Sequence, residues 1–267
     1  MKAPRRPKGA GAVMAAHAPA TVEADDAKTA LYRKLNYFPS PPWSFRAGGE
    51  LIQRLDPGSW RAHDPACGEG HGAYGLQETF GAVWRSDIHA HAQLDGAPAW
   101  RADFLADDAA WIPSDWIITN PPFDKAAEFV ARGLRVARRG VAMLCRRAWY
   151  GSAGRYELFH GDHPLGVRAP FFERVPMVLG KWDPAASTAT DYDWYVWFKP
   201  EIEPAWIAAV RAAALQRGLP GHVEIGIGPG AKRRLTRADD ARLFGAKSAQ
   251  PLFGVLDPAS PEEDPAP

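Results

Sequence analysis

The sequence contains few cysteines and no long apolar run. Among its 267 residues are only two cysteines, Cys67 and Cys145, too few for a disulfide framework. No apolar stretch is long enough to cross a membrane, and the basic N-terminus lacks the apolar segment of a signal peptide. We therefore expect a cytoplasmic protein without a membrane partner.

A strong net charge is also missing. The formal net charge is +1, so the chain as a whole is not attracted to nucleic acid. Any contact with nucleic acid must therefore come from a local basic patch. Hydrophobic residues make up 46% of the chain, which is enough for one sizeable core and favours a single domain.

The apolar run Trp116–Thr119 ends in Asn120, Pro121, Pro122 and Phe123. The run predicts a buried strand. The two prolines fix φ and remove backbone donors, and each keeps the residue before it out of the helical region. Asn120 should therefore project its side-chain oxygen from the strand end, and Phe123 should offer a flat face for stacking. This arrangement suits methyl transfer to a planar amino group.

A second strand end runs into an acidic turn rich in glycine, Asp64-Pro65-Ala66-Cys67-Gly68-Glu69-Gly70. Glycine allows positive φ and a close approach of the backbone to a ligand. The next strand pattern ends at Asp87 and Ile88, about one strand-helix-strand step further on. In nucleoside-binding α/β folds, an acid in that place binds the ribose hydroxyls.

Strand and helix patterns alternate along the chain. Ser40 and Pro41 predict a helix start, with Ser40 as the cap and Pro41 in the first turn. The alternation predicts the α/β class with a doubly wound, mostly parallel, seven-stranded sheet, which places ligands at the carboxyl ends of its strands. The expected strands are 60–63, 82–87, 100–104, 116–119, 141–145, 172–179 and 194–198, and the expected helices are 41–55, 69–80, 125–138 and 204–216.

The ordered motifs DPACGEG, SDI, ADF and NPPF resemble those of class I S-adenosylmethionine-dependent amino-methyltransferases, and most of all the phage- and prophage-type DNA adenine-N6 methyltransferases. The likeness covers roughly residues 37–198. It implies a Rossmann-like class I methyltransferase fold, S-adenosyl-L-methionine as the cofactor, and no metal. The implied layout is a methyltransferase catalytic domain over 29–200 and a C-terminal helix and strand extension of it over 201–256, between disordered segments at 1–28 and 257–267.

The resemblance also implies roles for individual residues in binding the cofactor. The methionine end would be held by the Ser40 and Asp64 segments, the ribose by Asp87, and the adenine by Ile88 and Asp103 with Phe104. A helix cap, an ordinary turn and a core phenylalanine are the structural alternatives for these positions. The implied cofactor site consists of Ser40, Pro42, Asp64, Ala66, Cys67, Gly68, Gly70, Asp87, Ile88, Asp103, Phe104 and Asn120.

Catalysis is assigned by the same resemblance to Asn120, Pro121, Pro122 and Phe123. The Asn120 side-chain oxygen and the Pro121 carbonyl would accept hydrogen bonds from the target amino group, and Phe123 would stack on a base flipped out of the duplex. A structural Pro-Pro turn is the alternative. Phosphate contact and stacking are expected from residues that follow the fifth strand, Arg146, Arg147, Trp149 and Tyr150.

The leading hypothesis is methylation of adenine N6 in DNA. Methylation of a protein glutamine, of an RNA base or of cytosine N4 in DNA uses similar geometry and remains an alternative, as does a non-catalytic cofactor-binding subunit. The sequence shows no separate target-recognition domain, so recognition is expected from loops such as 149–170 or from a protein partner. The oligomeric state stays open.

Overall fold

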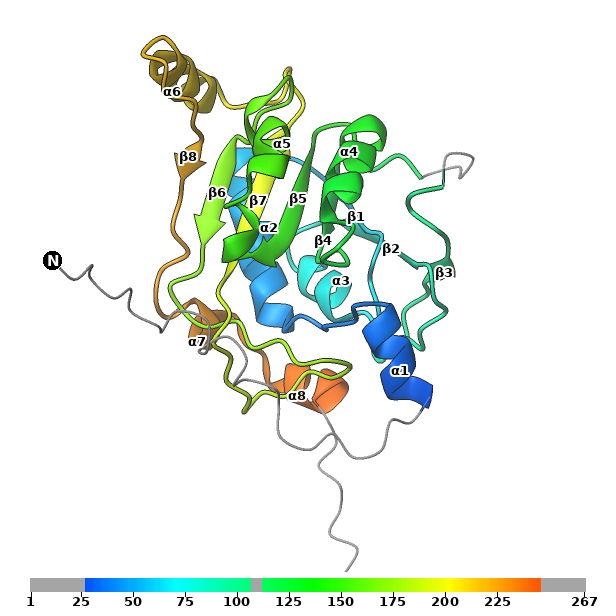
Figure 1. Ribbon diagram of the computed structural model, residues 1–267. Coiled ribbons are helices and arrows are strands. Elements are labelled where there is room, and N and C mark those ends of the chain that lie inside the picture. The colour runs from blue at the N-terminus through cyan, green and yellow to red at the C-terminus, as the bar shows by residue number, and fades with distance from the viewer. Residues whose placement is uncertain (1–26, 107–111, 246–267) are drawn as a thin grey trace, which may run out of the picture.

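The structure, a computed structural model, describes residues 27–106 and 112–245 (Figure 1). The predicted disorder of 257–267 lies outside these ranges, and so does that of 1–28 apart from its last residues, where helix α1 already begins. No helix in the described ranges is both long and apolar enough to cross a bilayer. The helices are α1 (Ala27–Lys34), α2 (Pro42–Leu55), α3 (His71–Leu76), α4 (Ala126–Val136), α5 (Tyr156–His160), α6 (Ala205–Leu215), α7 (Ala231–Leu235) and α8 (Ala238–Phe244), with short 3₁₀ turns at Arg147–Trp149 and Ala153–Arg155.

One twisted sheet in the order β3-β2-β1-β4-β5-β7-β6-β8 forms the centre of the molecule. The first five strands along the chain pair in parallel, and β7 runs antiparallel between β5 and β6. The predicted α/β class and the doubly wound, mostly parallel sheet are confirmed, and the two-residue β8 extends the expected seven strands to eight. The strands are β1 (Arg61–Asp64), β2 (Ala82–Asp87), β3 (Trp100–Arg101), β4 (Trp116–Thr119), β5 (Gly140–Arg146), β6 (Val167–Pro170), β7 (Tyr192–Phe198) and β8 (Val223–Glu224).

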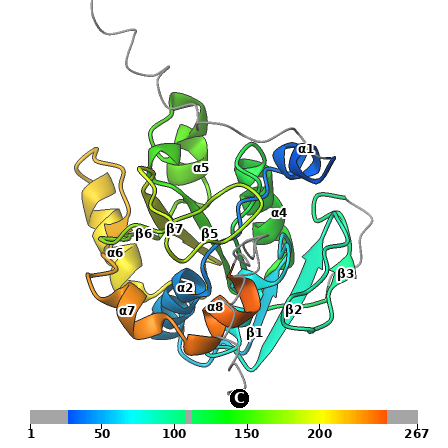
Figure 2. The same cartoon turned by 90° about the horizontal axis from the view of Figure 1, so that it is seen from below.

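Helices cover both faces of the sheet, with α4 and α5 on one side and α2, α7 and α8 on the other (Figure 2). Strands covered on both faces need apolar side chains throughout, and every residue of β4 and β7 is buried. The strand β1 is unusually polar for a central position. Its buried His63 contacts the neighbouring strand, because the ring Nε2 lies 2.9 Å from the Ser86 hydroxyl on β2.

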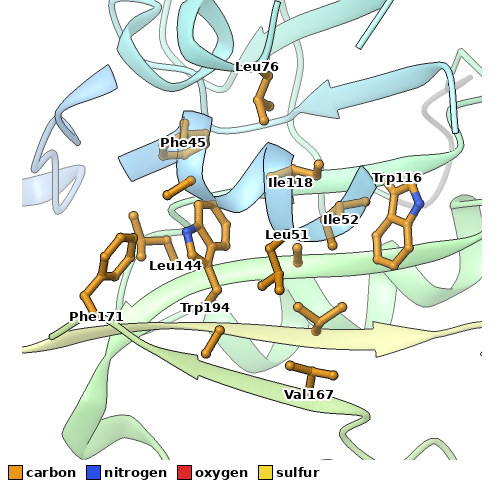
Figure 3. Close-up of a cluster of buried hydrophobic side chains, with 14 of the residues drawn as sticks. Phe45, Leu51, Ile52, Leu76, Trp116, Ile118, Leu144, Val167, Phe171 and Trp194 are labelled. Atoms are coloured by element: carbon orange, nitrogen blue, oxygen red, sulfur yellow. The ribbon is translucent and has the colours of Figure 1, made fainter. Parts of the chain in front are cut away.

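The larger core lies between α2 and the sheet. Phe45, Leu51 and Ile52 of α2 pack towards Ile118 and Trp194 of the strands (Figure 3). The smaller core on the opposite face joins α4 and α5 to β5 and β7. Both cores anchor the strands firmly, so the residues that follow each strand end hold fixed positions.

Two expected elements are wrong. Residues 172–179 form no strand, and the strand that pairs with β7 is Val167–Pro170. Pro176 cannot donate to a sheet ladder, and Phe172 is exposed, so the apolar appearance of the segment misled the prediction. Ser40 is not a helix cap: α2 begins at Pro42, with Pro41 in the cap position and no side-chain cap.

Candidate functional site

One cavity lies at the carboxyl ends of β1, β2 and β4, where the sequence predicts a ligand. Ser40 contacts Asn120 in its wall, and Asp64 contacts Thr119, the residue before Asn120. The cavity wall contains most of the predicted cofactor residues, namely Ser40, Asp64, Ala66, Cys67, Asp87, Ile88, Asp103, Phe104 and Asn120. Pro42, Gly68 and Gly70 are not part of the wall, although they shape the backbone behind it.

The glycine turn after β1 has the conformation that its sequence predicts. Gly68 and Gly70 have φ of +52° and +97°, values that other residues adopt with strain. The Gly68 N–H donates to Asp87 Oδ2 at 2.9 Å, and the His89 N–H donates to Asp87 Oδ1 at 3.0 Å. The Asp87 carboxylate is therefore fixed against the turn at the edge of the cavity.

Asp64 is a carboxyl group buried in the wall. Its Oδ1 accepts a hydrogen bond from the Thr119 hydroxyl at 2.7 Å and one from the Ala66 N–H at 3.3 Å. Burial disfavours the charged form and raises the pKa of Asp64 to about 7, although the bond from Thr119 opposes the shift. The ends of β1 and β4 are joined directly by this contact.

Two residues of the cavity wall, Ile88 and Asp103, are exposed to solvent. Ile88 has 52% of its surface exposed, which leaves an apolar face without cover. Asp103 is exposed, and its Oδ1 accepts a bond from the Leu105 N–H at 2.9 Å, as in an Asx turn. Phe104 is buried against Phe129, with ring centroids 5.1 Å apart, and contributes only part of its surface to the wall.

Asn120 follows β4 and is held from one side only. Its Nδ2 donates to the Phe38 carbonyl and to the Ser40 hydroxyl, each at 3.0 Å. These two acceptors define which end of the amide is the nitrogen. The opposite atom, Oδ1, is buried and has no hydrogen-bond partner among the described residues. Leaving a buried acceptor unsatisfied costs about 1–3 kcal/mol, so this atom requires an explanation.

Residues 35–39 also line the cavity, although their local sequence predicts no role in the site. Tyr37 donates to Glu69 Oε2 at 3.1 Å and accepts from the Glu69 N–H at 3.2 Å. Asn36 donates to Asp124 Oδ1 at 2.8 Å, which ties the same segment to the turn after β4. An aromatic pair before a proline was visible at 37–39, but only these distant contacts reveal its position.

Phe123 lies between another ring and a cation. Its ring centroid is 5.2 Å from that of Phe38, and the guanidinium carbon of Arg146 lies 4.2 Å from the Phe123 centroid. Phe123 is half-buried, and Arg146 is exposed at the end of β5. These two predicted substrate residues are therefore in direct contact.

The cavity wall contains none of the predicted substrate residues, Phe123, Arg146, Arg147, Trp149 and Tyr150. Arg147 Nε donates to the buried Asp193 at 3.0 Å, so its charge is already balanced. The indole of Trp149 packs on Phe159, with centroids 5.2 Å apart, in the smaller core. The Tyr150 hydroxyl lies 3.2 Å from His160 Nε2. These contacts give Arg147, Trp149 and Tyr150 structural roles that do not involve Phe123.

No protein-family model matches the sequence, and no curated protein matches it either. Several solved structures with a similar arrangement are described as methyltransferases. A protein of Pyrococcus horikoshii described as an RNA methyltransferase has 13% identity and a TM-score of 0.44, over 64% of this chain and 98% of that one. A type I restriction-modification methyltransferase subunit of Streptococcus thermophilus has 11% identity and a TM-score of 0.44, over 67% of this chain and 53% of that one.

An O-methyltransferase of Bacillus cereus in complex with SAH has 12% identity and a TM-score of 0.42, over 66% of this chain and 92% of that one. The chain thus spans only about half of the Streptococcus subunit. Likenesses this distant describe the arrangement of strands and helices, and function has to be inferred from the site itself.

Proposed function

We propose that this protein transfers a methyl group from S-adenosyl-L-methionine to the exocyclic N6 of adenine in DNA. The observation that carries the proposal is the unpartnered Oδ1 of Asn120. It is an acceptor at a strand end beside the cavity, and a target amino group is the donor that would satisfy it. The Pro-Pro turn that follows fixes its position.

The residues of the cavity wall support S-adenosyl-L-methionine as the ligand. Asp87 lies where ribose hydroxyls would be bound, and Ile88 offers its exposed face to the adenine ring. Asp64 and Ser40 would hold the methionine end, because Ser40 contacts Asn120 and Asp64 contacts the preceding Thr119. When bound there, the cofactor supplies a methyl group on a positively charged sulfur.

The residues of this chain would act by positioning rather than by strong base catalysis. Asn120 Oδ1 and the Pro121 carbonyl accept hydrogen bonds from the amino group and turn its lone pair towards the methyl group. The new bond joins nitrogen to the methyl carbon while the carbon–sulfur bond breaks and its electron pair stays on sulfur. The amino nitrogen becomes acidic only after methylation, so water can take the released proton.

DNA is the favoured substrate because a stacking ring and an exposed cation lie together close to Asn120 in the sequence and at the neighbouring strand end. Phe123 would stack on the base, and Arg146 provides positive charge beside it for a phosphate. Paired arginines elsewhere balance much of the surrounding charge, as Arg147 does with Asp193. Sequence recognition would come from loops near the site or from a protein partner.

Incubation with labelled S-adenosylmethionine and unmethylated genomic DNA, followed by nucleoside mass spectrometry, tests the proposal. We expect N6-methyladenine from the native protein and none from Asn120→Ala, which should still bind the cofactor. N4-methylcytosine would keep the mechanism and change the base. Absence of a DNA product from a protein that binds the cofactor would refute the proposed substrate, and parallel assays with RNA and with protein glutamine would then identify the class.

A further inference from the structure

The guanidinium of Arg146 covers one side of the Phe123 ring. The 4.2 Å between the guanidinium carbon and the ring centroid is a direct cation–π contact and leaves no room for a second ring on that side. Phe38 is a second neighbour of Phe123, with centroids 5.2 Å apart, and the Arg146 guanidinium carbon lies 6.0 Å from the Phe38 centroid. Since Phe123 also packs against the larger core, a base that stacks on the side covered by Arg146 must displace the guanidinium.

Arg146 is the neighbour that can move. Phe38 is fixed, because its backbone carbonyl accepts the hydrogen bond from Asn120 and its ring packs against the larger core. Arg146 is exposed and is the last residue of β5. Within the part of the chain that the structure describes, a hydrogen bond to the Tyr192 hydroxyl holds the Arg146 side chain, and no ion pair to a carboxylate does. Arg147 beside it pairs with Asp193 and Asp191.

We propose that Arg146 occupies the place of the target base in the free protein, and that the base takes this place as the guanidinium leaves it for a phosphate. This inference rests on the proposed function and adds a gating role to one residue of that site. A cation–π contact at an exposed site is weaker than the stacking of a base on an aromatic ring, so the exchange runs towards the bound state. A phosphate accepts the released guanidinium in charge-assisted hydrogen bonds.

The exchange predicts opposite effects on two ligands when Arg146 is replaced by alanine. Adenosine carries no phosphate, so its binding should only gain from removal of the competitor, with a dissociation constant about 2- to 5-fold lower. A short DNA oligonucleotide should bind more weakly, and the slope of its log affinity against log salt should fall by about one. Both are measured by calorimetry with saturating S-adenosylhomocysteine, which keeps adenosine out of the cofactor cavity.

Arg146→Lys separates the two roles, because lysine keeps the charge and lacks the planar group. It should bind adenosine more tightly than the native protein and retain most of the salt dependence. Arg138→Ala is the matched control: it removes one exposed arginine near the opposite end of β5, and should change neither ligand.

Two results for adenosine binding would contradict the inference, and methylation of DNA by the native protein tests the proposed function separately. Unchanged adenosine binding in Arg146→Ala would show a phosphate contact without exchange, and weaker adenosine binding would show that Arg146 is a permanent wall of the base site; either overturns the inference. If the native protein methylates DNA in these cases, the proposed function stands while the exchange fails. If it methylates no DNA, the proposed function fails and the inference falls with it.

Discussion

Asn120 and Ser40 are separated by 80 residues in the sequence, yet Asn120 Nδ2 lies 3.0 Å from Ser40 Oγ. Ser40 therefore connects the start of α2 to the end of β4. It acts on the amide end that is opposite to the proposed catalytic oxygen, and so orients Asn120 rather than capping a helix.

Ser40→Ala should lower kcat about 2- to 10-fold, because one of the two oxygen acceptors that orient the Asn120 amide is lost. Methyl transfer at saturating DNA, together with cofactor affinity by calorimetry, checks this. The matched control is Ser44→Ala, which removes another buried hydroxyl whose bond goes to the Pro41 carbonyl. An equal loss of kcat in both variants would show that Ser40 acts only through stability.

The raised pKa of Asp64 predicts that the free energy of unfolding falls as pH rises. Its folded pKa is about 7, above the ordinary value near 4, so between these values the folded state holds a proton that the unfolded state has released. The free energy of unfolding should therefore decrease across that range, by up to about 4 kcal/mol if no other group compensates. Asp64→Asn should remove this decrease in denaturant titrations between pH 4 and 8.

Asp115→Asn is the control for the titration of Asp64. Asp115 lies at the opposite end of β1 and accepts hydrogen bonds from the Trp60 and Arg61 N–H groups at 2.8 and 2.9 Å. This variant should keep the decrease of stability with pH. If Asp64→Asn keeps it as well, the burial of Asp64 is not its source.

A buried ion pair ties the C-terminal helices to α2. Arg46 donates twice to Asp240, at 2.7 and 2.8 Å, and both side chains are inaccessible to solvent. Asp240→Asn should lower the free energy of unfolding by up to about 3–5 kcal/mol, because Arg46 loses its fully buried counter-charge and keeps only the more exposed Glu78 carboxylate among the described residues. Glu50→Gln removes a paired carboxylate from Arg234 at the surface and should cost no more than about 1 kcal/mol in the same urea titration.

Gly48 lies inside α2, where alanine would ordinarily favour the helix. A Cβ at Gly48 would lie 2.5 Å from Cε2 of the Trp194 indole, which is itself fully buried. Gly48→Ala should therefore destabilise the protein by about 1–3 kcal/mol, against a helix gain of about 0.5–1 kcal/mol. The cost should shrink in a Trp194→Phe background, and a cost that stays the same in that background would place the strain elsewhere.

Local patterns predicted the parts of the site that belong to single segments. The buried run before Asn120, the positive φ of Gly68 and Gly70, and the acid at the end of β2 are all set by nearby residues. The cavity position followed from the parallel sheet, because ligands lie at the carboxyl ends of such strands.

The remaining features depend on contacts between distant segments. Nothing local shows that Tyr37 meets Glu69, or that Arg147 meets Asp193 while its neighbour Arg146 meets Phe123. The position of β6 was missed for a related reason: residues 172–179 and 167–170 both look like strands, and only pairing with β7 decides between them.

The unsatisfied oxygen of Asn120 would also select ligands by whether one substituent is a hydrogen-bond donor or an acceptor. A ligand amino group would donate a hydrogen bond to Asn120 Oδ1 and so remove the cost of the unsatisfied acceptor. A ligand carbonyl in the same place would weaken binding, since two acceptors repel each other. Adenine and hypoxanthine have nearly the same shape and differ at this position. A site built on Asn120 would therefore accept the first and reject the second, although no side chain needs to clash with either.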